Sequence, residues 1–285
     1  MLTSVKLVDG DREMILLPRQ DQGVHFQELD APFPAVRAST EDRTDDDGED
    51  DTTSLHGARS CSIELLVTQQ ARTIEDELTR FLHPRSRPYL VVADDEWAQA
   101  RRLRLRVAQW SAPLTVELPR AARRIQAQWQ APDGVWEAAD LVTETISADM
   151  PGTAGRIYPR TYPYAYPATL AAGASVIVNV GGTPSHYTAR LYGPCIGPRL
   201  TNETTGETIA FTAGLTLAAG EYVEISTRDR TAYLNGHSAL SRLNVIDFDV
   251  TSWWRIEPGE QQVRYAPAVV FAGAAAVIDY RPAWL

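Results

Sequence analysis

Lysine, cysteine and long apolar runs are scarce in this chain of 285 residues, and each scarcity narrows its range of functions. Lys6 is the single lysine among 27 basic residues. The two cysteines, Cys61 and Cys195, lie far apart in sequence, which argues against a disulfide framework and predicts two buried thiols. The longest apolar run, residues 266–278, contains a proline and a glycine and is too short to cross a bilayer. The first residues contain no apolar stretch typical of a secretory signal, so we expect no membrane insertion.

Sequence signatures of common enzyme classes are also missing. The chain has no H-E-x-x-H, no G-x-S-x-G and no G-x-x-x-x-G-K-[ST] motif, the local signatures of zinc proteases, serine hydrolases and P-loop enzymes. The five histidines show no metal-ligand spacing. Carboxylates near Asp94 and near Asp247 are the candidates for a glycosidase pair, but they fit a strand end and the outer face of a strand. We expect a protein that is not an enzyme, with no catalytic residue, cofactor or metal ion.

Negative charge is concentrated in the first half of the chain. The formal net charge is −10, and residues 151–285 carry equal numbers of acidic and basic residues. Most of the excess lies in the run EDRTDDDGEDD at residues 41–51, which we interpret as a solvated loop. Specific nucleic-acid binding is not expected of such an acidic chain, because contacts to phosphates require clustered Arg and Lys.

The residue spacing of this acidic run does not fit a calcium-binding loop. When Asp45, Asp47 and Gly48 are aligned with an EF-hand loop, Arg43 and Ser54 occupy positions where the loop needs oxygen ligands. The solvated loop is therefore the interpretation that we adopt.

Alternating apolar and polar residues between turn signals predict a mostly β chain, and its length fits two domains. One helix is predicted at residues 73–82, with Thr73 as its N-cap and a single apolar face that packs on a sheet. A segment rich in proline and glycine, with repeated Tyr-Pro pairs, separates the two halves. We predict an N-terminal β-sandwich-like domain at 1–140, a linker at 141–167 and a C-terminal β-sandwich at 168–285, whose final strand ends at the chain terminus.

Two ordered sets of motifs resemble the siphophage distal tail protein family. In the C-terminal part these are PRLTN at 198–202, LAAGEYVEI at 217–225, LNG at 234–236, SWW at 252–254 and YRPAW at 280–284. In the N-terminal half they are LDAPFP at 29–34, GARS at 57–60 leading into a strand, the helix, and YLVV at 89–92. The resemblance implies a ring-forming N-terminal domain and a C-terminal galectin-like β-sandwich of jelly-roll type.

The same resemblance implies a structural role in a virion. Six N-terminal domains would form a hexameric ring at the distal end of the tail tube, and the C-terminal domains would project outward as docking sites. The implied partners are the tail tube protein, the tape measure protein, the tail-tip or baseplate hub protein, and receptor-binding proteins. The protein would be assembled in the host cytoplasm and located at the phage tail tip.

Charged residues of the N-terminal half are the candidate ring contacts. The segment RLRLRV at 102–107 predicts a strand with three guanidinium groups on one face and three apolar residues on the other. A row of arginines suits an acidic loop of the same chain or of a neighbour. The candidate residues for the ring interface or channel are Asp45, Asp46, Asp47, Arg102, Arg104 and Arg106. We expect residues 1–150 to oligomerise alone and residues 165–285 to fold as a monomer.

A carbohydrate-binding module of an adhesin is the alternative function, because galectin-like sandwiches also occur in sugar-binding proteins. The candidate docking or sugar-contact residues are Trp253, Trp254, Asn235 and His237. Adjacent tryptophans on a strand point to opposite faces, so at least one of the two is expected in the core.

Overall fold

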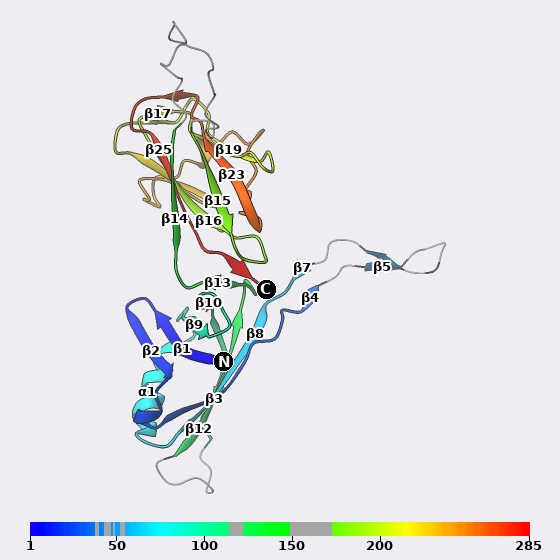
Figure 1. Cartoon of the computed structure of the whole chain (residues 1–285), viewed down its shortest axis with the longest axis vertical. Helices are drawn as coiled ribbons and strands as arrows, with labels where there is room; N and C mark the ends of the chain where they lie inside the picture. Colours follow the sequence, from blue (N-terminus) through cyan, green and yellow to red (C-terminus); the bar gives the residue numbers. More distant parts are fainter. Residues whose placement is uncertain (38–39, 43–46, 48, 52–54, 114–121, 149–172) are drawn as a thin grey trace, which may run out of the picture. The chain divides into compact units, whose positions relative to one another are not determined.

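The computed structural model describes residues 1–37, 40–42, 47, 49–51, 55–113, 122–148 and 173–285. The described chain is mostly β and contains one α-helix, which confirms the predicted fold class. It divides into two compact units, each drawn in Figure 1. The first consists of Met1–Asp140 with Trp284–Leu285, and the second of Leu141–Ala283.

The first unit is built from two antiparallel sheets. The six-stranded sheet has the order β2-β1-β9-β10-β13-β26: β2 Arg12–Leu17, β1 Leu2–Asp9, β9 Tyr89–Asp94, β10 Arg101–Arg104, β13 Trp136–Ala138 and β26 Ala283–Trp284. The four-stranded sheet has the order β11-β12-β8-β3: β11 Arg106–Ser111, β12 Arg123–Ala131, β8 Arg59–Val67 and β3 Val24–Asp30. A short 3-10 helix, Gln20–Gln22, precedes β3. Buried residues alternate along these strands, as in β8, where Cys61, Ile63 and Leu65 are inside.

Helix α1 spans Ala71–Phe81, two residues ahead of the predicted start. Ile74, Leu78 and Phe81 are buried in the core of the first unit, which confirms the predicted apolar face. Thr73 is not the N-cap as predicted but lies inside the helix. The N-cap is Gln70, whose φ is 49°. The helix starts at Ala71, which is buried in the same core as the apolar face.

The connection between the paired strands β3 and β8 is a long hairpin, which we call the arm. It contains two successive antiparallel ladders: β4 Val36–Arg37 with β7 Leu55–His56, and β5 Thr40–Asp42 with β6 Glu49–Asp51 (Figure 1). The predicted solvated loop at 41–51 is therefore wrong for its two flanks, which are strands. Strand pairing satisfies backbone hydrogen bonds even where the residues are too polar to pack into a core.

The second unit contains two larger sheets and one small sheet. The five-stranded sheet has the order β14-β25-β16-β21-β22: β14 Val142–Ser147, β25 Ala275–Tyr280, β16 Tyr187–Tyr192, β21 Tyr222–Ser226 and β22 Thr231–Leu234. The four-stranded sheet has the order β15-β23-β18-β19: β15 Ala174–Asn179, β23 Gly259–Tyr265, β18 Arg199–Asn202 and β19 Thr208–Ala210. The small sheet has the order β20-β17-β24: β20 Thr216–Leu217, β17 Cys195–Ile196 and β24 Val269–Val270. A 3-10 helix, Leu243–Val245, lies between β22 and β23.

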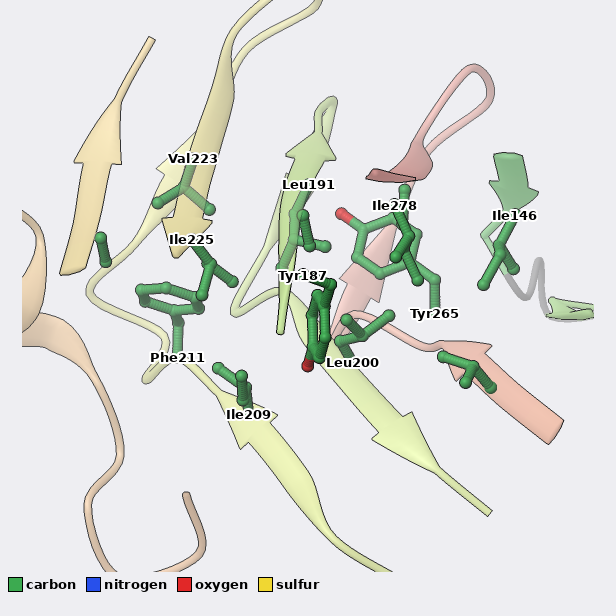
Figure 2. Packing of buried hydrophobic residues seen from close by; sticks show 14 of the residues in the cluster. Ile146, Tyr187, Leu191, Leu200, Ile209, Phe211, Val223, Ile225, Tyr265 and Ile278 are labelled. Atoms are coloured by element: carbon green, nitrogen blue, oxygen red, sulfur yellow. The ribbon is translucent and has the colours of Figure 1, made fainter. Parts of the chain in front are cut away.

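The core of the second unit lies between its two larger sheets, as expected for a β-sandwich. Figure 2 shows Leu191 and Ile278 of one sheet facing the same interior as Leu200 and Tyr265 of the other. Tyr265 is fully buried, and its hydroxyl donates to the carbonyl of Tyr192 at 3.0 Å. The sulfur of Cys195 lies 3.3 Å from the same hydroxyl. Cys195 and Cys61 are both buried and free, which confirms the predicted thiols.

The domain limits expected from the sequence need two corrections. Residues 142–147 are strand β14, paired with β25 over six residue pairs, and not linker. The rest of the predicted linker, residues 149–167, lies outside the described residues. The chain end, Trp284–Leu285, belongs to the first unit rather than to the predicted C-terminal sandwich. Both differences are matters of long-range pairing, which leaves no local pattern in the sequence.

Candidate interaction surfaces

The arginine-rich segment 102–107 runs through two different sheets. Arg104 pairs with Tyr89 of β9, whereas Arg106 pairs with Gln130 of β12. The single predicted strand is therefore wrong, because the chain changes sheets at Leu105, whose N–H donates to the carbonyl of Pro88 at 2.8 Å. The predicted alternation of arginines with buried apolar residues nevertheless continues across the change of sheet.

The apolar residues of this segment contribute to the core. Leu103 and Leu105 are buried, and Val107 packs against the core of the first unit. Arg104 and Arg106 are exposed on the opposite side. Burial of one face therefore leaves two arginines of the predicted row available for contacts.

Arg102 is used inside the first unit. Its Nε and Nη2 donate to Oε2 of Glu137 at 3.0 and 2.8 Å, and its guanidinium lies 4.3 Å from the ring centre of Tyr89. Its side chain is 22% exposed. A guanidinium that donates twice to one carboxylate oxygen and lies over an aromatic ring is not free for a neighbouring protomer. Of the predicted row, only Arg104 and Arg106 remain as contact candidates.

Arg101 stacks between two tryptophans, an arrangement that sequence analysis missed. Its guanidinium carbon lies 4.3 Å from the ring centre of Trp97 and 4.2 Å from that of Trp284. Trp97 in turn meets Trp136 edge to face at 6.0 Å. Burial lowers the pKa of Arg101 below its ordinary value. Trp284 was expected in the C-terminal sandwich, and nothing in the local sequence pairs it with a residue nearly two hundred positions earlier.

Replacing Trp284 by alanine is expected to destabilise the first unit by about 1–3 kcal/mol, since it removes a half-buried aromatic ring and a cation–π contact. Hydrogen exchange should rise in β10 and β13 and stay unchanged in β16 and β21. The matched control is Phe271→Ala, an exposed aromatic residue of the second unit. Faster exchange confined to β16 and β21 would contradict the assignment of Trp284 to the first unit.

The acidic run forms a like-charged ladder along the arm. Glu41 lies opposite Asp50 and Asp42 lies opposite Glu49 in the β5–β6 register. Asp47 is exposed, whereas the two other predicted channel residues, Asp45 and Asp46, lie outside the described residues.

A basic hollow of about 340 Å³ lies at the base of the arm. Its charged or titratable lining residues are Arg37, His56 and Arg106, and all three are exposed. Its other lining residues are Gly57, Ala58, Gln130 and Pro132. Among the residues that the structure describes, neither Arg37 nor Arg106 has a side-chain hydrogen bond or an ion pair. Within the described part of the chain, the hollow thus presents two guanidinium groups that lack a carboxylate partner.

The candidate sugar-contact residues of the second unit are not assembled into one site. Trp254 is 2% exposed, and its ring centre lies 4.6 Å from that of Tyr187 at an angle of 45°, so its indole offers no exposed face to a sugar. Trp253 is half-buried and packs against the core. Asn235 and His237 share the turn after β22, where the Asn235 side-chain oxygen accepts from the N–H of Tyr222 at 3.0 Å.

Three exposed valines mark a further surface of the second unit that sequence analysis missed. Val176, Val178 and Val180 are 38%, 40% and 64% exposed and follow each other at the two-residue period of a strand. Val176 and Val178 lie in β15, an edge strand of its sheet. In sequence, the alternation of these valines with Ile177 and Asn179, which are buried, is the pattern that could have revealed this surface.

In the described ranges, no three or more His, Cys, Asp or Glu residues are gathered so that they could hold a metal ion. The only α-helix found there, α1, has 11 residues and does not qualify as a membrane span.

Comparison with known proteins agrees with the resemblance noted in the sequence. Residues 181–284 match the family model described as siphovirus-type tail component, C-terminal domain. The fold is similar to the crystal structure of Dit from phage SPP1, with a TM-score of 0.65 and 10% sequence identity over 99% of both chains. That protein is described as a paradigm of the hub adsorption apparatus in phages that infect Gram-positive bacteria.

A second similar structure comes from the baseplate of phage P2 in its activated conformation with calcium. The TM-score is 0.54 and the sequence identity 13%, over 99% of this chain and 98% of that one. The search of curated proteins gave no match. Residues 181–284 thus match the C-terminal domain of a siphovirus-type tail component, and the fold of the chain is similar to that of SPP1 Dit over 99% of its length.

Proposed function

We propose that this chain forms a hexameric ring at the distal end of a siphophage tail tube and connects the tube to the tail tip or baseplate. The observation that carries the proposal is the shared fold over 99% of this chain and of SPP1 Dit, together with the family match at residues 181–284. Its role is structural and not enzymatic. The proposed partners are other copies of this chain, the tail tube protein, the tape measure protein and the hub protein.

The first unit is the proposed ring-forming part. It carries the excess negative charge, the arm and the exposed arginines Arg104 and Arg106, and these supply complementary charges around a ring. The arm also exposes apolar side chains that a small ladder cannot bury by itself: Phe33 is 78%, Val36 62% and Leu55 55% exposed. A contact between copies would bury this surface.

The second unit is the proposed outward docking part. Its charge is nearly balanced, and the row Val176, Val178 and Val180 at an edge strand offers an apolar surface for peripheral or receptor-binding proteins. Location in the virion tail tip, after assembly in the host cytoplasm, follows from this role.

Light scattering on the purified full-length chain tests the ring. At low salt we expect a particle with six, or twelve, times the chain mass of 31.5 kDa, the latter for two stacked rings. Added salt should weaken the particle without abolishing it, because buried apolar contacts are not screened. A monomer at every protein concentration and salt concentration would overturn the proposal.

A further inference from the structure

The hollow at the base of the arm gathers positive charge from separate elements. Arg37 comes from β4 and His56 from β7 of the arm, whereas Arg106 comes from β11 of the four-stranded sheet. All three side chains are exposed, so a ligand can reach them. No Asp or Glu of the described residues lines the hollow, although the chain has ten more acidic than basic residues. The hollow is therefore a basic site on an acidic protein.

Neither guanidinium group of the hollow is neutralised by the described part of the chain. Arg37 and Arg106 have no ion pair and no side-chain hydrogen bond there, whereas Arg102, four positions before Arg106, donates twice to Glu137. Each guanidinium offers five N–H donors. Gln130 also lines the hollow, opposite Arg106 in the β11–β12 ladder, and adds a side-chain amide. An anion in the hollow would accept hydrogen bonds from these donors.

A third guanidinium, that of Arg59, adds positive charge directly after the lining residue Ala58. Arg59 is 3% exposed, and its Nε and Nη1 donate to the carbonyl oxygens of Gly134 and Ala31 at 3.0 and 2.9 Å. Its Nη2 is buried and has no hydrogen-bond partner among the described residues. Carbonyl oxygens carry no net charge, so the charge of Arg59 raises the electrostatic potential at the base of the arm.

Close backbone contacts fix the elements around the hollow. The N–H of Gly57 donates to the carbonyl of Ala35 at 2.7 Å, and a methyl group on Gly57 would lie 3.9 Å from Cγ of Arg37. A methyl group on Gly134, in the turn after β12, would meet the carbonyl oxygen of Gly57 at 2.8 Å. The arm base is thus held against the sheet before any ligand arrives, which lowers the entropic cost of binding.

The hollow suits a small divalent oxyanion better than an extended polyanion. Its volume of about 340 Å³ is in the range of small-ligand pockets. Two permanently charged guanidinium groups match the two negative charges of a phosphate group and can donate paired hydrogen bonds to its oxygens. Nucleic acid would need a longer row of cations, and the adjoining hollow, which shares Gln130, is lined by Asp30.

We propose that the hollow lined by Arg37, His56 and Arg106 binds a small phosphate-type oxyanion, either inorganic phosphate or a phosphate monoester. The anion bridges β4 of the arm and β11 of the sheet, removes the repulsion between the two guanidinium groups and fixes the base of the arm. This site belongs to the first unit and does not depend on the proposed ring.

Titration of the full-length chain with inorganic phosphate, at an ionic strength held constant with sodium chloride, tests the site. Calorimetry should show one saturable site per chain, and phosphate should raise the midpoint of thermal unfolding. Arg37→Gln and Arg106→Gln remove the charge but keep an amide, and each should weaken phosphate binding at least roughly tenfold. The matched control is Arg12→Gln with Arg85→Gln, two exposed arginines outside the hollow, which should bind phosphate as the unmodified chain does.

A second measurement needs no variant. Phenylglyoxal modifies accessible guanidinium groups, and mass spectrometry of the digested chain gives the modification rate at each arginine. Phosphate should slow the modification of Arg37 and Arg106 and leave that of Arg12 unchanged. Circular dichroism checks that the two hollow variants are folded.

Three outcomes would overturn the site. The first is an unmodified chain that shows no saturable phosphate binding, and the second is unchanged phosphate affinity in both folded hollow variants. The third is tighter binding of duplex DNA or of an oligoglutamate peptide than of phosphate at an equal concentration of anionic groups, which would make an extended polyanion the occupant. The particle mass of the unmodified chain in the same buffers reports on the proposed ring separately.

Discussion

Replacing Gly181 by alanine is expected to destabilise the second unit by about 3 kcal/mol or more, enough to remove a large part of the stability of a typical domain. A methyl group at this position would overlap the backbone nitrogen and oxygen of Ala283. The surrounding backbone is held by hydrogen bonds: the N–H of Thr183 donates to the carbonyl of Ala283 at 3.1 Å, and the N–H of Gly181 to the side-chain oxygen of Asn179 at 2.9 Å. The overlap therefore involves backbone atoms that cannot rotate away.

The neighbouring Gly182 provides the control. A methyl group there meets no atom within 4 Å, and its backbone φ lies outside the left-handed region. Gly182→Ala should leave stability unchanged or raise it by up to about 1 kcal/mol, because alanine restricts the unfolded chain. Urea unfolding followed by tryptophan fluorescence measures both variants. Equal stability of the two alanine variants would contradict the close approach of residues 181 and 283.

A C-terminal fragment that begins at residue 165 is expected to fold poorly, whereas one that begins at residue 141 should fold. The shorter fragment lacks β14, which pairs with β25 over six residue pairs and contributes the buried Ile146 to the core. Its loss removes a hydrophobic contribution of about 2–3 kcal/mol for Ile146 alone and leaves β25 as an unpaired edge open to aggregation. This revises the expectation, drawn from sequence, that residues 165–285 form a folded monomer.

Expression of fragments 141–285 and 165–285 tests this prediction. Light scattering and near-ultraviolet circular dichroism should show a folded monomer for the longer fragment and aggregates or a loosely packed chain for the shorter one. Two fragments of equal stability would show that β14 is dispensable and that the linker expected from sequence describes this segment better.

Local patterns were sufficient for many strands. The strands Tyr222–Ser226 and Thr231–Leu234 follow the alternation that predicts a mostly β chain, and the flanking Gly220 and Asn235-Gly236 turn residues are equally local signals. The apolar face of α1 was predicted for the same reason, although its start was placed two residues late. The buried thiols also followed from the number and spacing of the cysteines.

The candidate surfaces were predicted less well. The row of arginines at 102–107 reads as one strand in sequence, but Arg102 is taken by Glu137 and Tyr89, and Arg106 lies in another sheet. Arg37, which shares a hollow with Arg106, stood out in no motif. Pairing of a side chain depends on which residues the fold brings within a few ångströms, and composition contains no such information.

By itself the sequence determined the β class, the single helix, the acidic arm region and the resemblance to distal tail proteins, since all of these rest on residue type and short-range spacing. Only the tertiary structure decided that β14 completes the second unit, that Trp284 packs on Arg101 of the first, and that Arg37 and Arg106 share a hollow. Each of these contacts joins residues more than sixty positions apart. Such contacts depend on the packing and strand pairing of the whole chain, which weigh many weak preferences together, and no single segment encodes the result.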